Sequence, residues 1–195
     1  MSSFRKLLLI IFVIAFIIFG GYAGYVYGTT NYEKGTVTGT SYESSFLNIK
    51  IDLPSDFHMS SVSESSIINT SVDSKTSDGV EMLTVSDSTL CVVVIYTAES
   101  NPFTSIKNGV DSIKEQLSAK KIVYTFSDTT VERIASEQYY VVHAHGTDSG
   151  RTLDQDIYMR KIGVRFCTII VTYDPNIPKS VKEKNSVIAS ITDYE

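Results

Sequence analysis

Three histidines occur in the 195 residues, and two of them have a spacing suited to metal or acid–base chemistry. His143 and His145 are separated by one residue in a run that predicts a β-strand. Because successive side chains of a strand point to opposite faces, both imidazoles are expected on the same face. Two imidazoles on one face are a common part of a divalent-metal site. We favour a purely structural pair, and His143 and His145 are the candidate metal ligands of the alternative.

Two acidic residues, Asp154 and Asp156, follow across a predicted hairpin, and the length of its turn decides whether they meet the histidines. A two-residue turn, Ser149 and Gly150, would pair each histidine with one aspartate and give a mixed nitrogen and oxygen ligand set. A three-residue turn over residues 148–150 would separate them. We favour the three-residue turn because Gly150 then takes the left-handed position, whereas the shorter turn requires a positive φ at Ser149.

Cys91 and Cys167 are the only cysteines, and both lie in apolar runs typical of buried thiols. Outside the cytoplasm they could form a disulfide if their Cα atoms lay within about 7 Å, and this alternative stays open. Neither is expected to be catalytic, since a reactive thiol needs an exposed and electropositive setting.

Motifs that carry catalysis are missing from the sequence: there is no nucleophile elbow, phosphate-binding loop, zincin motif, dinucleotide fingerprint or EF-hand loop. We therefore expect a protein that is not an enzyme. An exported hydrolase that uses one histidine with Asp154 or Asp156 is the least favoured alternative. The basic residues near the hairpin are expected to form a solvated edge that resists aggregation: Arg151, Arg160, Lys161 and Arg165.

The elements that must position these residues begin with an uncharged N-terminal segment. Residues 7–28 contain no charged residue and are long enough for the ~20 residues of a membrane-spanning helix. Arg5 and Lys6 precede this segment, which predicts a cytoplasmic N-terminus and an extracellular remainder. The dense apolar core, residues 7–19, also fits a cleaved signal peptide. We expect a retained single-pass membrane anchor, with secretion as the alternative.

The remainder has the composition of one soluble domain. Residues 29–45 are rich in Thr, Ser and Gly and predict a juxtamembrane linker, so the domain is expected over residues 46–195. The formal charge of −5 and the lack of a basic patch exclude a typical nucleic-acid binder. A hydrophobic content of 43% excludes a disordered chain, and two cysteines exclude a disulfide-rich miniprotein.

Hydrophobic periodicity predicts an α+β class for this domain. The continuous β-branched run at residues 90–97 is typical of a central strand covered on both faces. Apolar residues from Phe103 to Leu117 step by three and four, which predicts a helix that begins at Pro102 after a cap at Ser100 or Asn101. A second helix is expected over residues 178–191, buried through Val181, Ile188 and Ile191. The other predicted strands are residues 47–53, 80–86, 120–126, 129–135, 138–147, 152–162 and 164–173. Antiparallel strands with two covering helices indicate α+β rather than a doubly wound sheet.

Several of these segments also carry a likeness to a known family. They are residues 42–57, with Pro54 before Asp56 and Phe57, the strands at 138–142 and 155–158, and the closing helix. Together they resemble the PsbP-like family, which includes an extrinsic photosystem II subunit, a Ran-binding relative and anchored or secreted Gram-positive proteins. Relatives usually carry Gly and an aromatic residue, often Trp, where this chain has Asp56 and Phe57. The resemblance covers about residues 42–191 and implies an α/β/α sandwich.

For function, the resemblance implies a non-catalytic accessory or binding module. We expect an extracellular domain that is anchored in the membrane through residues 7–28, binds a protein or cell-envelope component and needs no cofactor. The alternative is a divalent-metal-binding module that uses His143 and His145.

Overall fold

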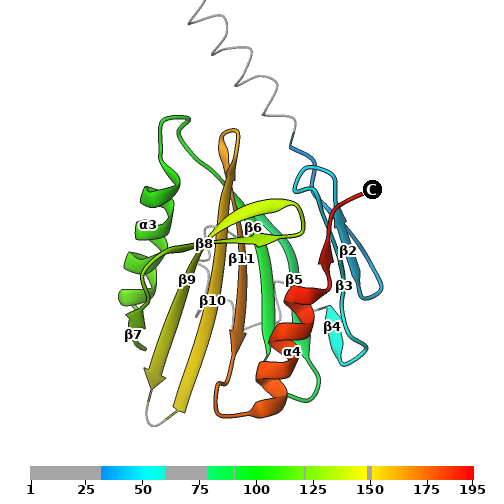
Figure 1. The fold of residues 1–195 in the computed structure, drawn as a ribbon, viewed down its shortest axis with the longest axis vertical. Helices are drawn as coiled ribbons and strands as arrows, with labels where there is room; N and C mark the ends of the chain where they lie inside the picture. Colours follow the sequence, from blue (N-terminus) through cyan, green and yellow to red (C-terminus); the bar gives the residue numbers. More distant parts are fainter. Residues whose placement is uncertain (1–31, 60–78, 90, 121, 149–150) are drawn as a thin grey trace, which may run out of the picture. The chain divides into compact units, whose positions relative to one another are not determined.

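The structure is a computed structural model that describes residues 32–59, 79–89, 91–120, 122–148 and 151–195 (Figure 1). The segment predicted to span the membrane, residues 7–28, lies outside these ranges. Within them, no helix is both long and apolar enough to cross a bilayer. The part Glu33–Glu195 forms one compact unit, which holds both buried cores described below.

An antiparallel sheet of eight strands runs through the centre of this unit (Figure 1). The strands are β4 (Phe57–Met59), β5 (Val80–Ser86), β6 (Val92–Glu99), β7 (Val123–Phe126), β8 (Thr130–Ile134), β9 (Glu137–Asp148), β10 (Arg151–Ile162) and β11 (Arg165–Tyr173). Their spatial order is β4-β5-β6-β11-β10-β9-β7, and β8 pairs with β9 as well. β6 lies between β5 and β11 and is buried over its first six residues. The central strand predicted at residues 90–97 is therefore confirmed.

A second sheet has four strands: β1 (Thr36–Thr38), β2 (Ser41–Ser44), β3 (Ile49–Asp52) and β12 (Ile191–Thr192). β1 and β2 lie where the sequence predicts a linker over residues 29–45, so the domain begins earlier than expected. The sequence analysis missed them because their residues are polar and only Tyr42 and Ser44 are buried. The pairing of β1 with β2 and of β2 with the neighbouring β3 holds them in place. Gly39, at a φ of 61°, makes the turn that joins them.

Helix α3 (Ile106–Ser118) begins later than the sequence predicts. Residues 101–104 form a turn instead, in which the Asn101 side chain accepts a hydrogen bond from the main-chain N–H of Phe103. Ser105 is the cap, since its hydroxyl accepts from the N–H of Asn108. Phe103 is consequently 83% exposed and is not part of the apolar stripe, which starts at Ile106.

Helix α4 (Pro178–Ala189) confirms the second predicted helix, and part of its predicted buried face is observed: Ile188 packs partly buried against the core. Ile191 is buried as predicted but belongs to β12, and the fully buried residues of the helix are Ser180, Glu183 and Val187. The polar residues are tolerated because they have partners: Glu183 accepts hydrogen bonds from Ser88 and Thr89. Hydrophobic periodicity alone cannot find a buried face of this kind.

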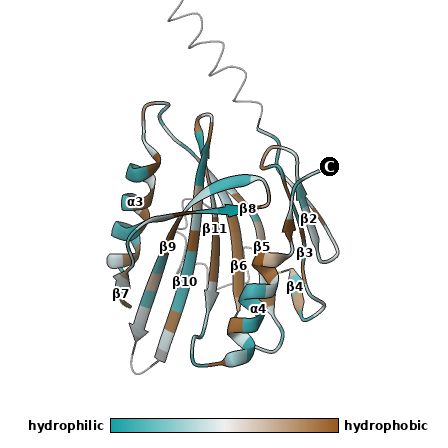
Figure 2. Cartoon of the chain, viewed as in Figure 1, coloured by the Kyte–Doolittle hydropathy of each residue, from teal (hydrophilic) through white to brown (hydrophobic). Residues whose placement is uncertain are grey.

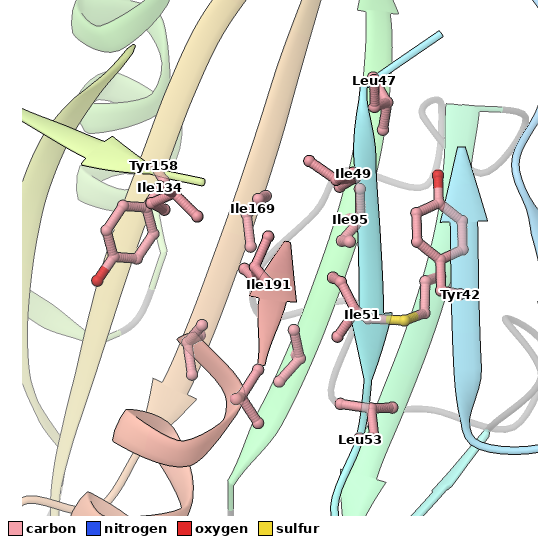
Figure 3. Close-up of a cluster of buried hydrophobic side chains, with 14 of the residues drawn as sticks. Tyr42, Leu47, Ile49, Ile51, Leu53, Ile95, Ile134, Tyr158, Ile169 and Ile191 are labelled. Carbon is pink, nitrogen blue, oxygen red and sulfur yellow. The ribbon is translucent and has the colours of Figure 1, made fainter. Parts of the chain in front are cut away.

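Two cores cover the two faces of the large sheet. On one face α3 packs against Val94, Ile157 and other apolar side chains. On the other face, α4 and the four-stranded sheet enclose a second cluster, in which Ile49, Ile51 and Ile191 face Ile95 and Ile169 (Figure 3). Figure 2 shows the apolar colour concentrated in the central strands and the polar colour on the helices. The predicted α+β class, with one helix on each face, is confirmed, and the small sheet adds to the layer of α4.

Candidate functional site

The turn between β9 and β10 is one residue shorter than the sequence predicts. Asp148 pairs with Arg151, so only residues 149 and 150 separate the strands, and these two lie outside the described ranges. The reason is the long ladder that follows, because a one-residue slip would turn every side chain of β10 to the wrong face. Such a slip would take Ile157 and Met159 out of the core under α3. The free energy lost by removing these side chains from the core is larger than the local conformational preference for a three-residue turn.

The corrected register sets one aspartate opposite each histidine. Asp156 pairs with His143 and Asp154 with His145, so the expected separation of acids from histidines is wrong. All four side chains lie on the face of the sheet that carries α4, since Val141 and Tyr158, each two residues away from one of them along its strand, point into that core.

The inner pair is built around a buried carboxylate. His143 Nδ1 lies 2.7 Å from Asp156 Oδ1, and the Asp156 side chain is 1% exposed whereas His143 is 51% exposed. Lys184 of α4 reaches the other carboxylate oxygen, Nζ to Oδ2 3.0 Å, and the Tyr173 hydroxyl donates to Oδ1 at 3.3 Å. Burial, together with the charge of Asp156, raises the pKa of Tyr173, so this hydroxyl stays protonated and able to donate.

The outer pair repeats the arrangement in a more open setting. His145 Nδ1 lies 2.5 Å from Asp154 Oδ1, with the histidine 51% and the aspartate 23% exposed. An ionised carboxylate can only accept hydrogen bonds, so in both pairs Nδ1 is the donor. In the neutral imidazole this leaves Nε2 as a lone-pair acceptor on the exposed side of each ring.

Around the histidines the sheet face is open. Thr125 of β7 stands directly opposite His145 and is exposed, and Val123 on the same face is 70% exposed. Helix α4 contacts β11 and does not cover these strands, as Figure 1 shows. We call the surface formed by Val123, Thr125, His143, His145 and Asp154 the His–Asp face.

This arrangement offers two kinds of chemistry. Two imidazole nitrogens from positions i and i+2 of one strand, about 7 Å apart at their backbones, can hold a divalent cation or accept hydrogen bonds from a bound molecule. In the described part of the chain no group of three or more His, Cys, Asp or Glu is arranged to hold a metal ion. A cation at His143 and His145 would therefore complete its coordination with water or with groups of a partner.

The hydrolase alternative requires the acids on the histidine face, and the structure meets that condition. Ser127 is the hydroxyl beside His143, whose main-chain N–H donates to Ser127 Oγ at 3.0 Å. The Ser127 hydroxyl itself donates to the carbonyl of Asp128 at 2.8 Å. Its proton is thus directed to the main chain and not to an imidazole, which is not the geometry of an activated nucleophile.

The two cysteines lie far apart along the central strands. Thr97 stands opposite Cys167, and Cys91 precedes β6, six residues away from Thr97 along the chain. At about 3.3 Å per residue this separation is about 20 Å, well beyond the reach of a disulfide. Both are free and buried, and burial raises the pKa of each thiol to about 12. The disulfide alternative is wrong, and two buried thiols are confirmed.

One of the basic residues near the hairpin, Arg160, has a different role from the one predicted. Arg160 is 8% exposed and not part of a solvated edge: it pairs with Glu137 at 2.5 Å, donates to the carbonyl of Leu47 and stacks over the Tyr139 ring. It ties β9 and β10 to the small sheet. Sequence reasoning missed this role, as it missed Lys184 and Tyr173, because each depends on contacts between residues far apart in the chain.

No family model matches the chain, and no curated protein matches it. The chain does resemble several solved structures. Cyanobacterial PsbP (CyanoP) from Synechocystis is 11% identical, with a TM-score of 0.51 over 84% of this chain and 99% of that one. LpqN, involved in cell envelope biogenesis of Mycobacterium tuberculosis, is 12% identical, with a TM-score of 0.51 over 89% and 96%.

A third structure, from Bacteroides thetaiotaomicron, is 14% identical with a TM-score of 0.48 over 82% of this chain, which spans 50% of that protein. The first two likenesses establish that the fold is PsbP-like, as the sequence resemblance implies.

Proposed function

We propose that this chain, with its PsbP-like fold, is a non-catalytic accessory or binding module of the cell envelope. The uncharged segment 7–28 tethers it to the membrane, with Arg5 and Lys6 on the cytoplasmic side and the domain outside. The fold is shared with LpqN, a protein involved in cell envelope biogenesis, which supports this setting. Fold alone is a weak guide to function, so the proposal rests on the site.

The observation that carries the proposal is the His–Asp face. His143 and His145 are half-exposed, yet each ring is held through Nδ1 by a carboxylate on the neighbouring strand. Groups fixed in this way lose little freedom on binding, which favours recognition. Ser127, the hydroxyl beside His143, donates its proton to a main-chain carbonyl and is not set up as a nucleophile. The partner is a protein or envelope component that presents N–H or O–H donors to the two Nε2 atoms.

Site-specific photo-crosslinking in living cells tests this proposal. A benzophenone amino acid placed at Thr125, on the His–Asp face, is expected to give a discrete adduct with the full chain. The same amino acid at Lys107, an exposed position on α3, is the matched control and should not give that adduct. Identical adduct patterns from both positions would contradict a binding role for the His–Asp face.

Divalent-metal binding is the second candidate function, and one specific observation favours it. Histidine ligands of metals usually donate their other ring N–H to a carboxylate, which is how Nδ1 of both His143 and His145 is engaged. Zinc, copper and nickel are the ions best suited to imidazole ligands.

A thermal unfolding experiment on the full chain tests the metal site. Zinc at 100 times its dissociation constant should add about 2.7 kcal/mol of stability, and the double variant His143→Ala/His145→Ala should lose this gain. The control is His58→Ala, which removes a histidine from β4 and should leave the gain intact. The same stabilisation in the double variant would exclude the site, and the binding-module proposal would stand.

A further inference from the structure

A cavity of about 330 Å³ lies between α3 and the large sheet, on the opposite face from the His–Asp face. Its volume falls within the range of small-ligand sites, about 300–1,000 Å³. Apolar side chains from three strands and the helix form its walls: Tyr96, Ile113, Met159 and Phe166. The cavity therefore offers aromatic and aliphatic contact to one side of a small molecule.

The helix lines the mouth of this cavity with uncharged polar groups. Asn108, Ser112 and Gln116 are spaced by four residues, so they form one row along α3. All three are exposed, and the Gln116 amide donates to the Ser112 hydroxyl at a long 3.4 Å. Amide and hydroxyl groups at this spacing can donate to and accept from hydroxyl groups of a ligand.

A buried hydroxyl lines the inner end. Thr168 of β11 is fully buried. Tyr96 stands opposite Thr168 in the register, and its side chain interacts with the Thr168 hydroxyl. The inner end of the cavity is therefore closed by two side chains that contact each other.

The charge around the cavity restricts the ligand. Among the residues that line the cavity, Glu99 is the one with a charged side chain. Its carboxylate already forms an ion pair with Arg165 at 2.7 Å. The nearby Lys161 donates to the carbonyls of Asn101, Pro102 and Thr104. A charged ligand would find no free counter-ion among the lining residues, and burying its charge would be costly.

The helix lies close to the sheet beside the cavity. At Gly109 a Cβ atom would lie 2.9 Å from Met159 Sδ and 3.0 Å from Phe166 Cζ, so a larger residue would require these two side chains to shift. Since both contacted side chains also line the cavity, its walls belong to a packed region of the protein.

We propose that this cavity is a binding site for a small uncharged ligand that has an apolar ring face and several hydroxyl groups. The ring face lies against Tyr96 and Phe166, and the row of Asn108, Ser112 and Gln116 hydrogen-bonds its hydroxyls. The site is separate from the His–Asp face, so the two proposals stand or fall independently.

Ligand-observed NMR tests the proposal, with the full chain in lipid nanodiscs and phenyl β-D-glucopyranoside as the probe. We expect saturable binding above that of empty nanodiscs. Ser112→Trp, which fills the mouth, should weaken binding at least tenfold. Ser118→Trp makes the same substitution on an exposed turn of α3 outside the cavity and should bind like the wild type. Far-UV circular dichroism checks that both variants fold, and Gln116→Trp replaces Ser112→Trp if the latter does not.

One further measurement defines the ligand class. Phenyl phosphate, which has the ring and a charge, should not bind. Absence of saturable glucoside binding, equal binding to Ser112→Trp, or equal binding of phenyl phosphate would overturn the proposal.

Discussion

Asp156 is the buried carboxylate on which the His–Asp face depends, and its replacement by Asn gives the sharpest test of the geometry. Three groups converge on it from different elements: His143 of β9, Tyr173 of β11 and Lys184 of α4. Removing one partner of a buried ion pair costs about 3–5 kcal/mol. Lys184 is 17% exposed and His143 51% exposed, so both recover some hydration and the lower end applies. We expect Asp156→Asn to cost about 3 kcal/mol.

Urea unfolding of the full chain measures this cost. With a slope of about 2 kcal/mol per molar urea, the midpoint should fall by about 1.5 M while the slope stays unchanged. Asp154→Asn is the matched control: it removes the same charge from the same strand, but its partner is solvent-exposed, so it should cost less than about 1 kcal/mol. Equal costs for the two variants would refute the view that Asp156 is the structural anchor of the site.

Three other expectations concern the cores and the helix start. Cys91 and Cys167 should resist N-ethylmaleimide at pH 8 in the native chain and react in urea, because burial raises the pKa of both thiols to about 12; rapid labelling of the native chain would count against this. Burial raises the pKa of Tyr96 to about 12, so the unfolded chain loses this proton near pH 10 and the folded chain does not. Stability should therefore fall from pH 10 to 12, and Tyr96→Phe should make the fall shallower in urea titrations at each pH. Ser105→Ala should cost about 1 kcal/mol in thermal melts by removing the cap of α3; unchanged stability would show that Ser105 is not the cap.

Elements with strong local patterns were predictable from the sequence. The β-branched run that forms β6 and the apolar stripe of α3 each carry their own signal of burial; β6 lies where the sequence predicts it, and α3 differs only in its later start. β1 and β2 carry no such signal because their stability comes from strand pairing, of β1 with β2 and of β2 with β3. The buried face of α4 was predicted through Ile188 but not through Glu183, which is buried by hydrogen bonds to distant residues.

The candidate site was predictable in its residues but not in its geometry. The spacing of His143 and His145 indicates a shared face, and that is observed. The register was mispredicted because turn preferences near residue 150 were weighed without the cost of turning Ile157 and Met159 out of the core. Lys184 and Tyr173 could be assigned to Asp156 only once α4 and β11 were placed beside β10.

The central claim is that the His–Asp face binds a partner without catalysis. The most direct measurement compares photo-crosslinking from Thr125 in the wild-type chain and in the His143→Ala/His145→Ala variant, in living cells and at equal expression. We expect a discrete adduct in the wild type and its loss in the variant. An adduct of equal yield in both would contradict it, because the two imidazoles would then contribute nothing to the interface.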